Sequence, residues 1–344
     1  NSNIVMKQNQ IFAPTYGLYI SQLNTINATA NSEISNNFMA GGTYGTYLTT
    51  YSKVNVYHNS FGGGTSGYYS FTPNGDVDIR NNIFAGNSSY AFYSSTAPTT
   101  GFALNYNIYH SVSGASIAYC TSAQSTLTAW KTAQPAFNVN SLQGDPGFVS
   151  ATDYHIIGTF PNNVGQNGLS MVDVDGDLRP ASGSTIVDIG ADEFTPLNWD
   201  ASLEEIVVDL GGCGDSTTMI EVVVKNFGLN TITSLPITVN YSGGLTGSVN
   251  VTASVSIAQG ASATIPVGSF NTYAGATGVN FTGTASLVGD QNNANNTLTK
   301  GPGSYIPVEP VTHGMVDTVC PVGTVDLYAI GVLGTEYKWY DAAV

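Results

Sequence analysis

Three charged residues on one short segment, Asp76, Asp78 and Arg80, are the side chains in the first half of the chain best suited to acid–base chemistry. Hydrolysis of a glycosidic bond needs two carboxylates, and a calcium-dependent elimination needs carboxylates for the metal and a cationic base. Between residues 1 and 144 the only further acid is Glu33. The segment therefore predicts a surface ion pair around Arg80, with catalysis by these three residues as the alternative.

A second group of carboxylates occupies alternate positions and could bind a hard cation. These residues are Asp173, Asp175 and Asp177. Calcium favours oxygen ligands in this kind of spacing, but the run is not an EF-hand, because Leu178 and Ser184 stand where Gly and Glu are required. The competing interpretation is that Arg179 is held by these aspartates and by Asp188 or Asp192. No cofactor is required, and structural calcium is the only metal that we consider.

Tyrosines are abundant, and rings that face outward could stack on sugars. The candidate ligand-binding rings are Tyr44, Tyr57, Tyr68, Tyr90 and Tyr93. His58, His110 and His155 do not have the spacing of a metal site, so we expect structural roles for them.

Composition excludes several classes of partner. The 344 residues include 8 Lys and Arg against 23 Asp and Glu, a formal net charge of −15, so neither nucleic acid nor an acidic membrane surface is an expected partner. The longest apolar runs have the length of strands, which predicts no membrane insertion. The spacing of Cys120, Cys213 and Cys320 does not decide how they pair.

The first half contains five copies of a pattern centred on an asparagine. The asparagines are Asn9, Asn37, Asn59, Asn82 and Asn107, spaced 28, 22, 23 and 25 residues apart. An apolar column follows two positions later, at Ile11, Met39, Phe61, Phe84 and Tyr109. A second column follows ten positions later, at Tyr19, Tyr47, Tyr69, Phe92 and Ile117. Short strands without a helical period predict a solenoid, in which both columns face inward and the asparagines form a ladder of hydrogen-bonded amides.

This pattern resembles that of the pectin-lyase-like superfamily over roughly residues 1–150, which implies a right-handed parallel β-helix. A later string contains Gly144-Asp-Pro-Gly-Phe148, Asp153-Tyr-His-Ile156, the aspartate run and Asp188-Ile-Gly-Ala-Asp-Glu-Phe194. It resembles the C-terminal cap of secreted bacterial β-helix proteins. We therefore expect a β-helix domain over residues 1–197 whose cap, at about 144–197, ends the solenoid.

The second half changes to longer alternating strands separated by turns, typical of an antiparallel β-sandwich. Val222 to Gly228 and Gly289 to Thr297 resemble CARDB-type Ig-like modules of bacterial surface proteins, which places such a domain at residues 198–303. The segment Tyr337-Lys-Trp-Tyr-Asp341 resembles an Ig-like repeat of giant proteins exported by gliding bacteria. Residues 304–344 would begin that module, and we expect the protein to continue past Val344.

The same resemblance implies type IX secretion and O-glycosylation. Asp215-Ser216-Thr217 and Asp317-Thr318-Val319 are similar to the acceptor motif of such bacteria, which makes Ser216 and Thr318 candidate modified residues.

The sequence thus predicts an all-β, secreted, cell-surface or extracellular protein that is non-catalytic and serves as an adhesin or a structural stalk. Its expected partners are glycans, other copies or modules of a longer chain, and the type IX export machinery. The alternative is a polysaccharide lyase or glycoside hydrolase that uses the groove of the β-helix. The carboxylates on adjacent coils are too few for that chemistry, which favours the non-enzyme.

Overall fold

The computed structural model describes residues 3–23, 30–73, 76–86, 88–96, 101–111 and 116–306. The chain divides into two compact units, Asn1–Leu197 and Asn198–Val344.

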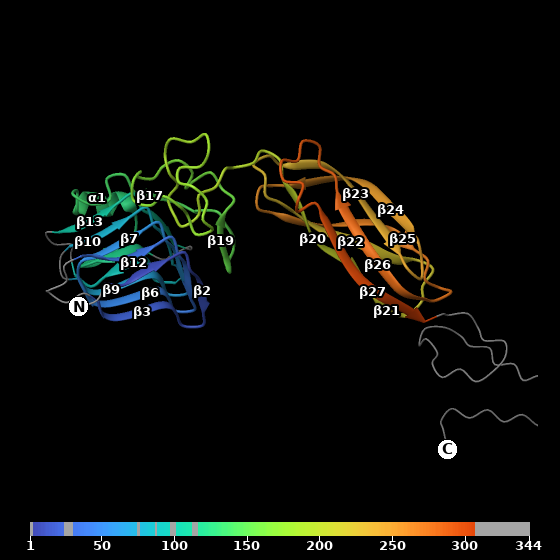
Figure 1. Cartoon of the computed structure of the whole chain (residues 1–344), viewed down its shortest axis with the longest axis horizontal. Helices are drawn as coiled ribbons and strands as arrows, with labels where there is room; N and C mark the ends of the chain where they lie inside the picture. Colours follow the sequence, from blue (N-terminus) through green and yellow to red (C-terminus); the bar gives the residue numbers. More distant parts are fainter. Residues whose placement is uncertain are drawn as a thin grey trace, which may run out of the picture. The chain divides into compact units, whose positions relative to one another are not determined.

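The first unit is a solenoid of three mainly parallel sheets, in which successive coils contribute one strand to each sheet (Figure 1). Sheet A contains β1 (Val5–Lys7), β4 (Ser32–Ser35), β7 (Val54–Tyr57), β10 (Val77–Arg80) and β13 (Phe102–Asn105). Sheet B contains β2 (Gln10–Ala13), β5 (Phe38–Gly41), β8 (Ser60–Gly63), β11 (Ile83–Gly86), β14 (Ile108–Ser111) and β17 (Leu142–Gln143). Sheet C contains β3 (Tyr16–Leu23), β6 (Tyr44–Tyr51), β9 (Ser66–Pro73), β12 (Tyr90–Ser94), β15 (Ser116–Cys120) and β16 (Ser122–Gln124). At the end of the solenoid, β17 extends sheet B alone and β16 pairs antiparallel with its neighbour.

In the core of the solenoid, apolar side chains at equivalent positions of successive coils stack into columns. Met39, Phe61, Phe84 and Tyr109 pair in register along sheet B and are fully buried. Glycine recurs where sheets B and C meet because the backbones approach closely there. A Cβ built at Gly45 would lie 2.5 Å from the carbonyl oxygen of Gly67 in the next coil.

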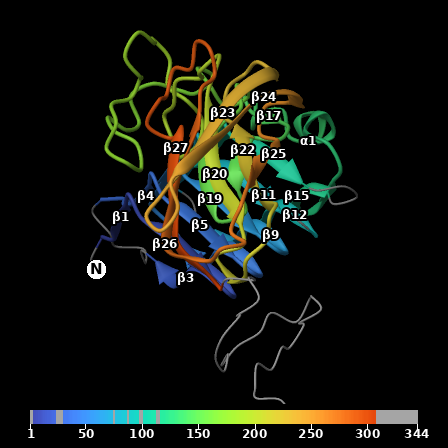
Figure 2. The same cartoon turned by 90° about the vertical axis from the view of Figure 1, so that its right-hand side faces the viewer.

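The last described coil is covered by a short helix. Helix α1 (Leu127–Ala133) begins at Thr126, whose hydroxyl accepts a hydrogen bond from the backbone N–H of Ala129. Figure 2 shows α1 beside β12 and β15. Its fully buried Trp130 packs on Phe92 and Tyr109, with ring centroids 5.6 and 5.1 Å away. Sheet B continues past this helix to β17, and the segment expected as a cap, at about 144–197, follows that strand directly.

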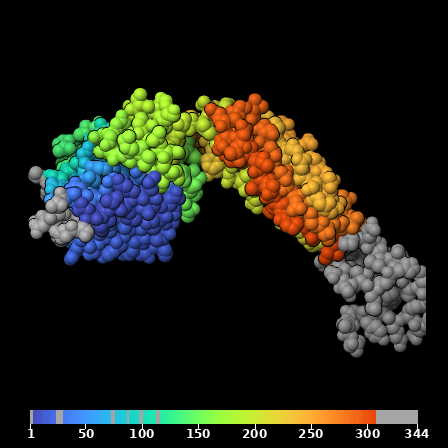
Figure 3. Space-filling model, viewed as in Figure 1, coloured from blue at the N-terminus to red at the C-terminus, as the bar shows by residue number. Residues whose placement is uncertain are grey.

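Residues 144–197 cover part of the outer face of sheet B. Figure 3 shows the yellow-green and green atoms of this segment against the blue and cyan coils. The hairpin of β18 (Phe148–Ser150) and β19 (Asp153–Ile156) places Tyr154 against Phe38. Ile156 and Ile189 pack against Ile83 and Ile108. The outer face of sheet B carries Phe38, Ile83 and Ile108, and these apolar side chains need a cover to bury them. We call residues 144–197 the lateral segment.

The second unit contains two sheets around one apolar core. The first contains β20 (Ala201–Val208), β22 (Thr218–Asn226) and β25 (Ser262–Phe270), all antiparallel. The second contains β21 (Gly211–Cys213), β27 (Thr297–Ile306), β26 (Ala276–Ala285), β23 (Ile232–Ser242) and β24 (Gly247–Ile257). Strand β27 reaches Ile306, so Ser304 belongs to this sheet and not to a following module. The remainder of the module expected at 304–344, with Thr318, lies outside the described residues.

The all-β class and the parallel solenoid are confirmed by these sheets. None of the helices in the described part of the chain is long and apolar enough to span a membrane.

Candidate functional site

Asp78 and Arg80, two of the three residues expected to form an ion pair or to catalyse, lie on the outer face of sheet A. Arg80 binds Asp78 through two nitrogens, with Nε 2.6 Å from Oδ1 and Nη2 on Oδ2. The hydroxyl of Tyr57, one coil away, donates to Oδ2 at 2.6 Å. Burial and this hydrogen bond raise the pKa of Tyr57 well above its usual value. Both oxygens of the Asp78 carboxylate therefore already have partners within the protein.

The other acids of the described coils are Asp76 and Glu33. Asp76 is exposed and precedes β10. Glu33 lies in the same row of the sheet as Asp78, but Asn55 stands between them. That separation is two strand spacings, about 10 Å. Glu33 is itself bound by Lys7 Nζ and by the hydroxyl of Ser35, each at 2.8 Å.

The five asparagines form a continuous ladder at the corner between sheets A and B. Each amide nitrogen donates to the side-chain oxygen of the next asparagine, from Asn9 through Asn37, Asn59 and Asn82 to Asn107, at 2.8 to 3.1 Å. The same nitrogens donate to backbone carbonyls, and the oxygens also accept from the backbone N–H of the preceding rung, as in Asn59. The ladder thus satisfies buried polar groups at the corner.

The second expected column differs from the observed one. Tyr68 is fully buried and stacks on Phe92 at 5.0 Å, so it is a core residue and not an outward ring. Tyr19, Tyr47 and Tyr69 point outward instead of inward. The sequence count failed because the turn between β11 and β12 is one residue longer than the turn between β8 and β9. One extra residue moves every following side chain to the other face.

The outward side of sheet C consequently carries a continuous group of tyrosines, which we call the tyrosine face. Its members are Tyr16, Tyr19, Tyr44, Tyr47, Tyr69, Tyr90, Tyr93 and Tyr119. Adjacent rings stack with centroids 5.3 Å apart for Tyr19 and Tyr47, 4.8 Å for Tyr47 and Tyr69, and 4.2 Å for Tyr69 and Tyr93. Because the rings cover one another's faces, this surface presents mainly ring edges and hydroxyls.

Tyr44, Tyr90 and Tyr93, three of the expected ligand-binding rings, belong to the tyrosine face, whereas Tyr57 lies on sheet A and Tyr68 in the core. Burial, with further contributions from neighbouring tyrosines, raises the pKa of Tyr44, Tyr47 and Tyr69. These hydroxyls therefore keep their protons at neutral pH and can donate hydrogen bonds.

The three alternating aspartates of the lateral segment do not converge. Oδ1 of the buried Asp173 accepts from the backbone N–H of Asp175, Gly176 and Asp177 at 2.8 to 2.9 Å. Its Oδ2 accepts from the N–H of Glu193 at 3.0 Å. Asp175 and Asp177 are exposed. Asp173 therefore shapes the loop through backbone hydrogen bonds, an arrangement that differs from a calcium loop in which all three carboxylates face one ion.

Arg179 is ion-paired, but its partner is Glu193 and not one of the expected aspartates. Arg179 Nη1 lies 2.8 Å from Glu193 Oε2, and both side chains are buried. Nη2 donates to the carbonyl of Gly190 at 2.9 Å. Asp188 and Asp192 instead accept backbone N–H bonds, from Asn163 and Phe194 and from Ile156.

Burial dominates the electrostatics of these two aspartates. It raises the pKa of Asp188 to about 7 and that of Asp192 to about 6, against the backbone hydrogen bonds that favour the charged form. His58, buried nearby, has a pKa well below its usual value because burial and Arg179 disfavour its cation. His58 accordingly remains neutral and pairs with the amide of Asn81 at 2.9 Å.

His155 lies among carboxylates on the outer side of β19. Its Nδ1 is 2.5 Å from Asp153 Oδ1, and its Nε2 is 2.8 Å from Asp175 Oδ2. Burial opposes protonation of the ring, yet the two hydrogen bonds raise the pKa of His155 above its usual value. Histidine spacing did not predict this cluster, because Asp175 lies 20 residues from His155 in the chain.

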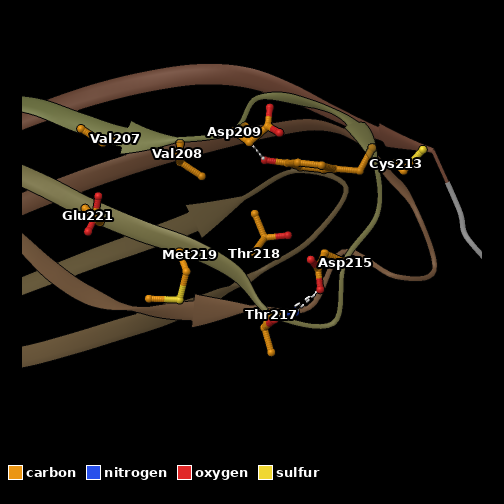
Figure 4. Close-up of a pocket in the computed structure, with 10 residues that line it drawn as sticks. Val207, Val208, Asp209, Cys213, Asp215, Thr217, Thr218, Met219 and Glu221 are labelled. Carbon is orange, nitrogen blue, oxygen red and sulfur yellow. Dashed lines mark hydrogen bonds between the residues drawn. The ribbon is translucent and has the colours of Figure 1, made fainter. Parts of the chain in front are cut away.

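One end of the second unit has an open hollow of about 430 Å³ whose lining includes Asp209, Asp215 and Tyr305 (Figure 4). Asp215 Oδ1 accepts from the N–H of Thr217 at 2.9 Å, which shapes the exposed turn that carries Ser216. Cys213 beside it is disulfide-bonded, whereas Cys120 is free and buried. Burial raises the pKa of the Cys120 thiol to about 11, so this thiol is unreactive.

Comparison with known families agrees with the fold of the first unit. Residues 1–129 match the family model described as right handed beta helix region. The first unit is a right-handed parallel β-helix. No curated protein and no solved structure matches the chain. The match is compatible with either a non-catalytic surface protein or a carbohydrate-active enzyme, so the choice between them depends on the side chains of this chain.

Several residues of the β-helix unit were not found from the sequence. These are Tyr16, Tyr19, Tyr47, Tyr69 and Tyr119 of the tyrosine face, Glu193, and the His155 cluster with Asp153 and Asp192. A signal for the first group was present, since tyrosine recurs three residues apart in Tyr16/Tyr19, Tyr44/Tyr47 and Tyr90/Tyr93. For Glu193 and His155 the pairing depends on how the loops of the lateral segment pass over sheet B.

Proposed function

We propose that the chain is part of a non-catalytic, secreted, cell-surface or extracellular protein that acts as an adhesin or structural stalk. The observation that carries this proposal is the state of Asp78, whose two carboxylate oxygens are occupied by Arg80 and Tyr57. The nearest acid in its row, Glu33, is two strands away and paired with Lys7. Neither carboxylate has the free partner that acid–base cleavage of a sugar chain needs.

The chain is expected to release no product from polysaccharides. Incubation with a panel of acidic and neutral polysaccharides, with and without calcium, should yield neither reducing ends nor unsaturated sugars above the level of Asp78→Asn and Arg80→Met variants. Release by the unaltered chain that both substitutions abolish would establish the alternative, a lyase or hydrolase working in the groove of the β-helix.

We further propose that the tyrosine face is the adhesive surface and that its ligand is a neutral polysaccharide. The hydroxyls of stacked rings recur at about the strand spacing of 4.8 Å, an interval comparable to one hexose unit, so a chain lying along the axis could bond to successive rungs. All eight members are uncharged, and the net charge of −15 disfavours an anionic polymer.

Removing hydroxyls while keeping the rings tests this ligand. The double variant Tyr47→Phe with Tyr69→Phe preserves stacking and should weaken binding of a neutral polysaccharide about ten- to a hundredfold, because each lost hydrogen bond costs roughly 0.5–1.5 kcal/mol. Affinity electrophoresis or calorimetry measures the change. Tyr57→Phe, on sheet A, is the matched control and should bind normally. Equal losses in both variants would exclude the tyrosine face as the binding surface.

The second unit is proposed to serve as a CARDB-type, Ig-like spacer. Its two sheets share one apolar core, and its strand lengths suit a sandwich. The disulfide at Cys213 supports an oxidising, extracellular location. Export by a type IX system and O-glycosylation of the exposed Ser216 remain proposals from the sequence motifs, and attachment to further modules would place the β-helix at a distance from the cell.

A further inference from the structure

Three parts of the lateral segment bring possible metal ligands together over sheet B. His155 comes from β19, Asp175 from the loop shaped by Asp173, and Asp192 from the segment that also carries Glu193. One ligand atom from each of these residues lies within 4.8 Å of the other two. Asp192 is buried and Asp175 is exposed, so the group opens to solvent on one side.

The ring of His155 is held in one orientation. Asp153 Oδ1 contacts Nδ1, and Phe38 packs edge-on against the ring with centroids 4.9 Å apart. Nε2 therefore points toward Asp175. A carboxylate behind the far nitrogen of a ligating histidine is the usual arrangement around protein metal ions, because it fixes the tautomer and raises the basicity of the ligating nitrogen.

The position of Asp192 is also fixed. Its Oδ2 accepts the N–H of Ile156 at 2.7 Å, which anchors the carboxylate beside the residue that follows His155. The exposed Asp175 is the ligand with freedom to move. In a tetrahedral zinc site with bonds of about 2.0–2.2 Å, ligand atoms lie roughly 3.3–3.6 Å apart. Asp175 Oδ2 lies 2.8 Å from His155 Nε2, so it would move slightly away from the ring to admit the ion, a shift that rotation of Asp175 can supply.

We propose that His155, Asp175 and Asp192 bind one divalent transition-metal ion, zinc being the best match, with Asp153 as a positioning residue. One imidazole nitrogen with two carboxylates suits zinc better than calcium, which prefers oxygen ligands alone. Two carboxylates also balance the charge of the ion. The ion would tie together the three parts of the lateral segment that cover sheet B and so stabilise this cover.

Calorimetric titration of the chelator-treated chain with Zn²⁺, Ca²⁺ and Mg²⁺ tests the site. One equivalent of Zn²⁺ should bind, raise the temperature of unfolding of the β-helix unit, and bind more tightly than Ca²⁺ or Mg²⁺. Asp175→Asn, at an exposed position, should lower the Zn²⁺ affinity at least tenfold. Asp177→Asn is the matched control, two residues away and outside the cluster, and should bind as the unaltered chain does.

Further variants separate ligation from positioning. His155→Gln should abolish binding, and Asp153→Asn should weaken it 10- to 100-fold while keeping one ion per chain. Replacement by Co²⁺ should give a visible spectrum that Asp175→Asn alters and that His110→Gln leaves unchanged. The proposal is overturned if Zn²⁺ binding is the same in the unaltered chain and in Asp175→Asn. It is equally overturned if Asp177→Asn removes binding, which would assign the ion to the alternating aspartates.

Discussion

Glu193→Gln is expected to destabilise the β-helix unit by about 3–5 kcal/mol, because the substitution leaves the charge of Arg179 buried without its anion. Glu193 also accepts backbone N–H bonds from Ala181 and Asp188, at 2.9 Å each. An amide at this position offers one acceptor in place of two, so one of these donors would face an NH₂ group. Denaturant unfolding, with the β-helix unit followed separately by amide exchange in its strands, measures the loss.

An exposed ion pair provides the control for this prediction. Lys7 and Glu33 lie 2.8 Å apart with partly exposed side chains, so Glu33→Gln should cost less than about 1 kcal/mol. Equal effects of the two substitutions would mean that the Arg179 pair is solvated in solution and that the lateral segment does not exclude water from it. Arg179→Met should resemble Glu193→Gln, since it leaves the carboxylate buried without its cation.

Asn59→Ala should be comparably damaging, with a loss of about 4 kcal/mol or more. Its amide nitrogen donates to the carbonyls of Ile34 and Tyr57 and to Asn82 Oδ1, and its oxygen accepts two bonds from Asn37. Alanine removes all of these at a fully buried position, and each buried group left without a partner costs roughly 1–3 kcal/mol. The free energy of unfolding of the β-helix unit is again the quantity to measure.

Asn55→Ala, in the same coil, is the comparison for the ladder. Asn55 is half-buried on the outer face of sheet A and accepts from the amide of Asn31 at 2.9 Å. A change within about 0.5 kcal/mol is expected there. If Asn59→Ala lowered the free energy of unfolding as little as Asn55→Ala, the ladder would contribute little to stability. The stacked apolar columns alone would then hold the coils together.

The features that the sequence predicted correctly are local and repeated. Strand alternation within a coil and an asparagine at each corner recur every 22 to 28 residues, and stacking at the strand spacing turns that repeat into the apolar column of sheet B. Phe38, Ile83 and Ile108 alternate with the inward column of sheet B and are also buried, so the outer face of this sheet has a cover. The segment expected as a cap, at about 144–197, packs on these side chains.

Counting along the sequence failed where a turn changed length. Tyr69 and Phe92 stand at the same count from Asn59 and Asn82, yet one faces solvent and the other the core. The turn between β11 and β12 has one extra residue, and strand pairing realigns the side chains after it. Only the paired strands show where the register resumes.

By itself, the sequence of this protein determined the all-β class and the stacked coils of its first unit, because every coil repeats the same strand alternation and the same corner asparagine. The tertiary structure alone decided which carboxylate binds Arg179, which carboxylates surround His155, and which tyrosines share one face. These pairings join loops that are distant or irregular in the chain. Their geometry depends on how each loop packs over sheet B or on how the length of each turn shifts the strand register. Residue spacing predicts neither of these.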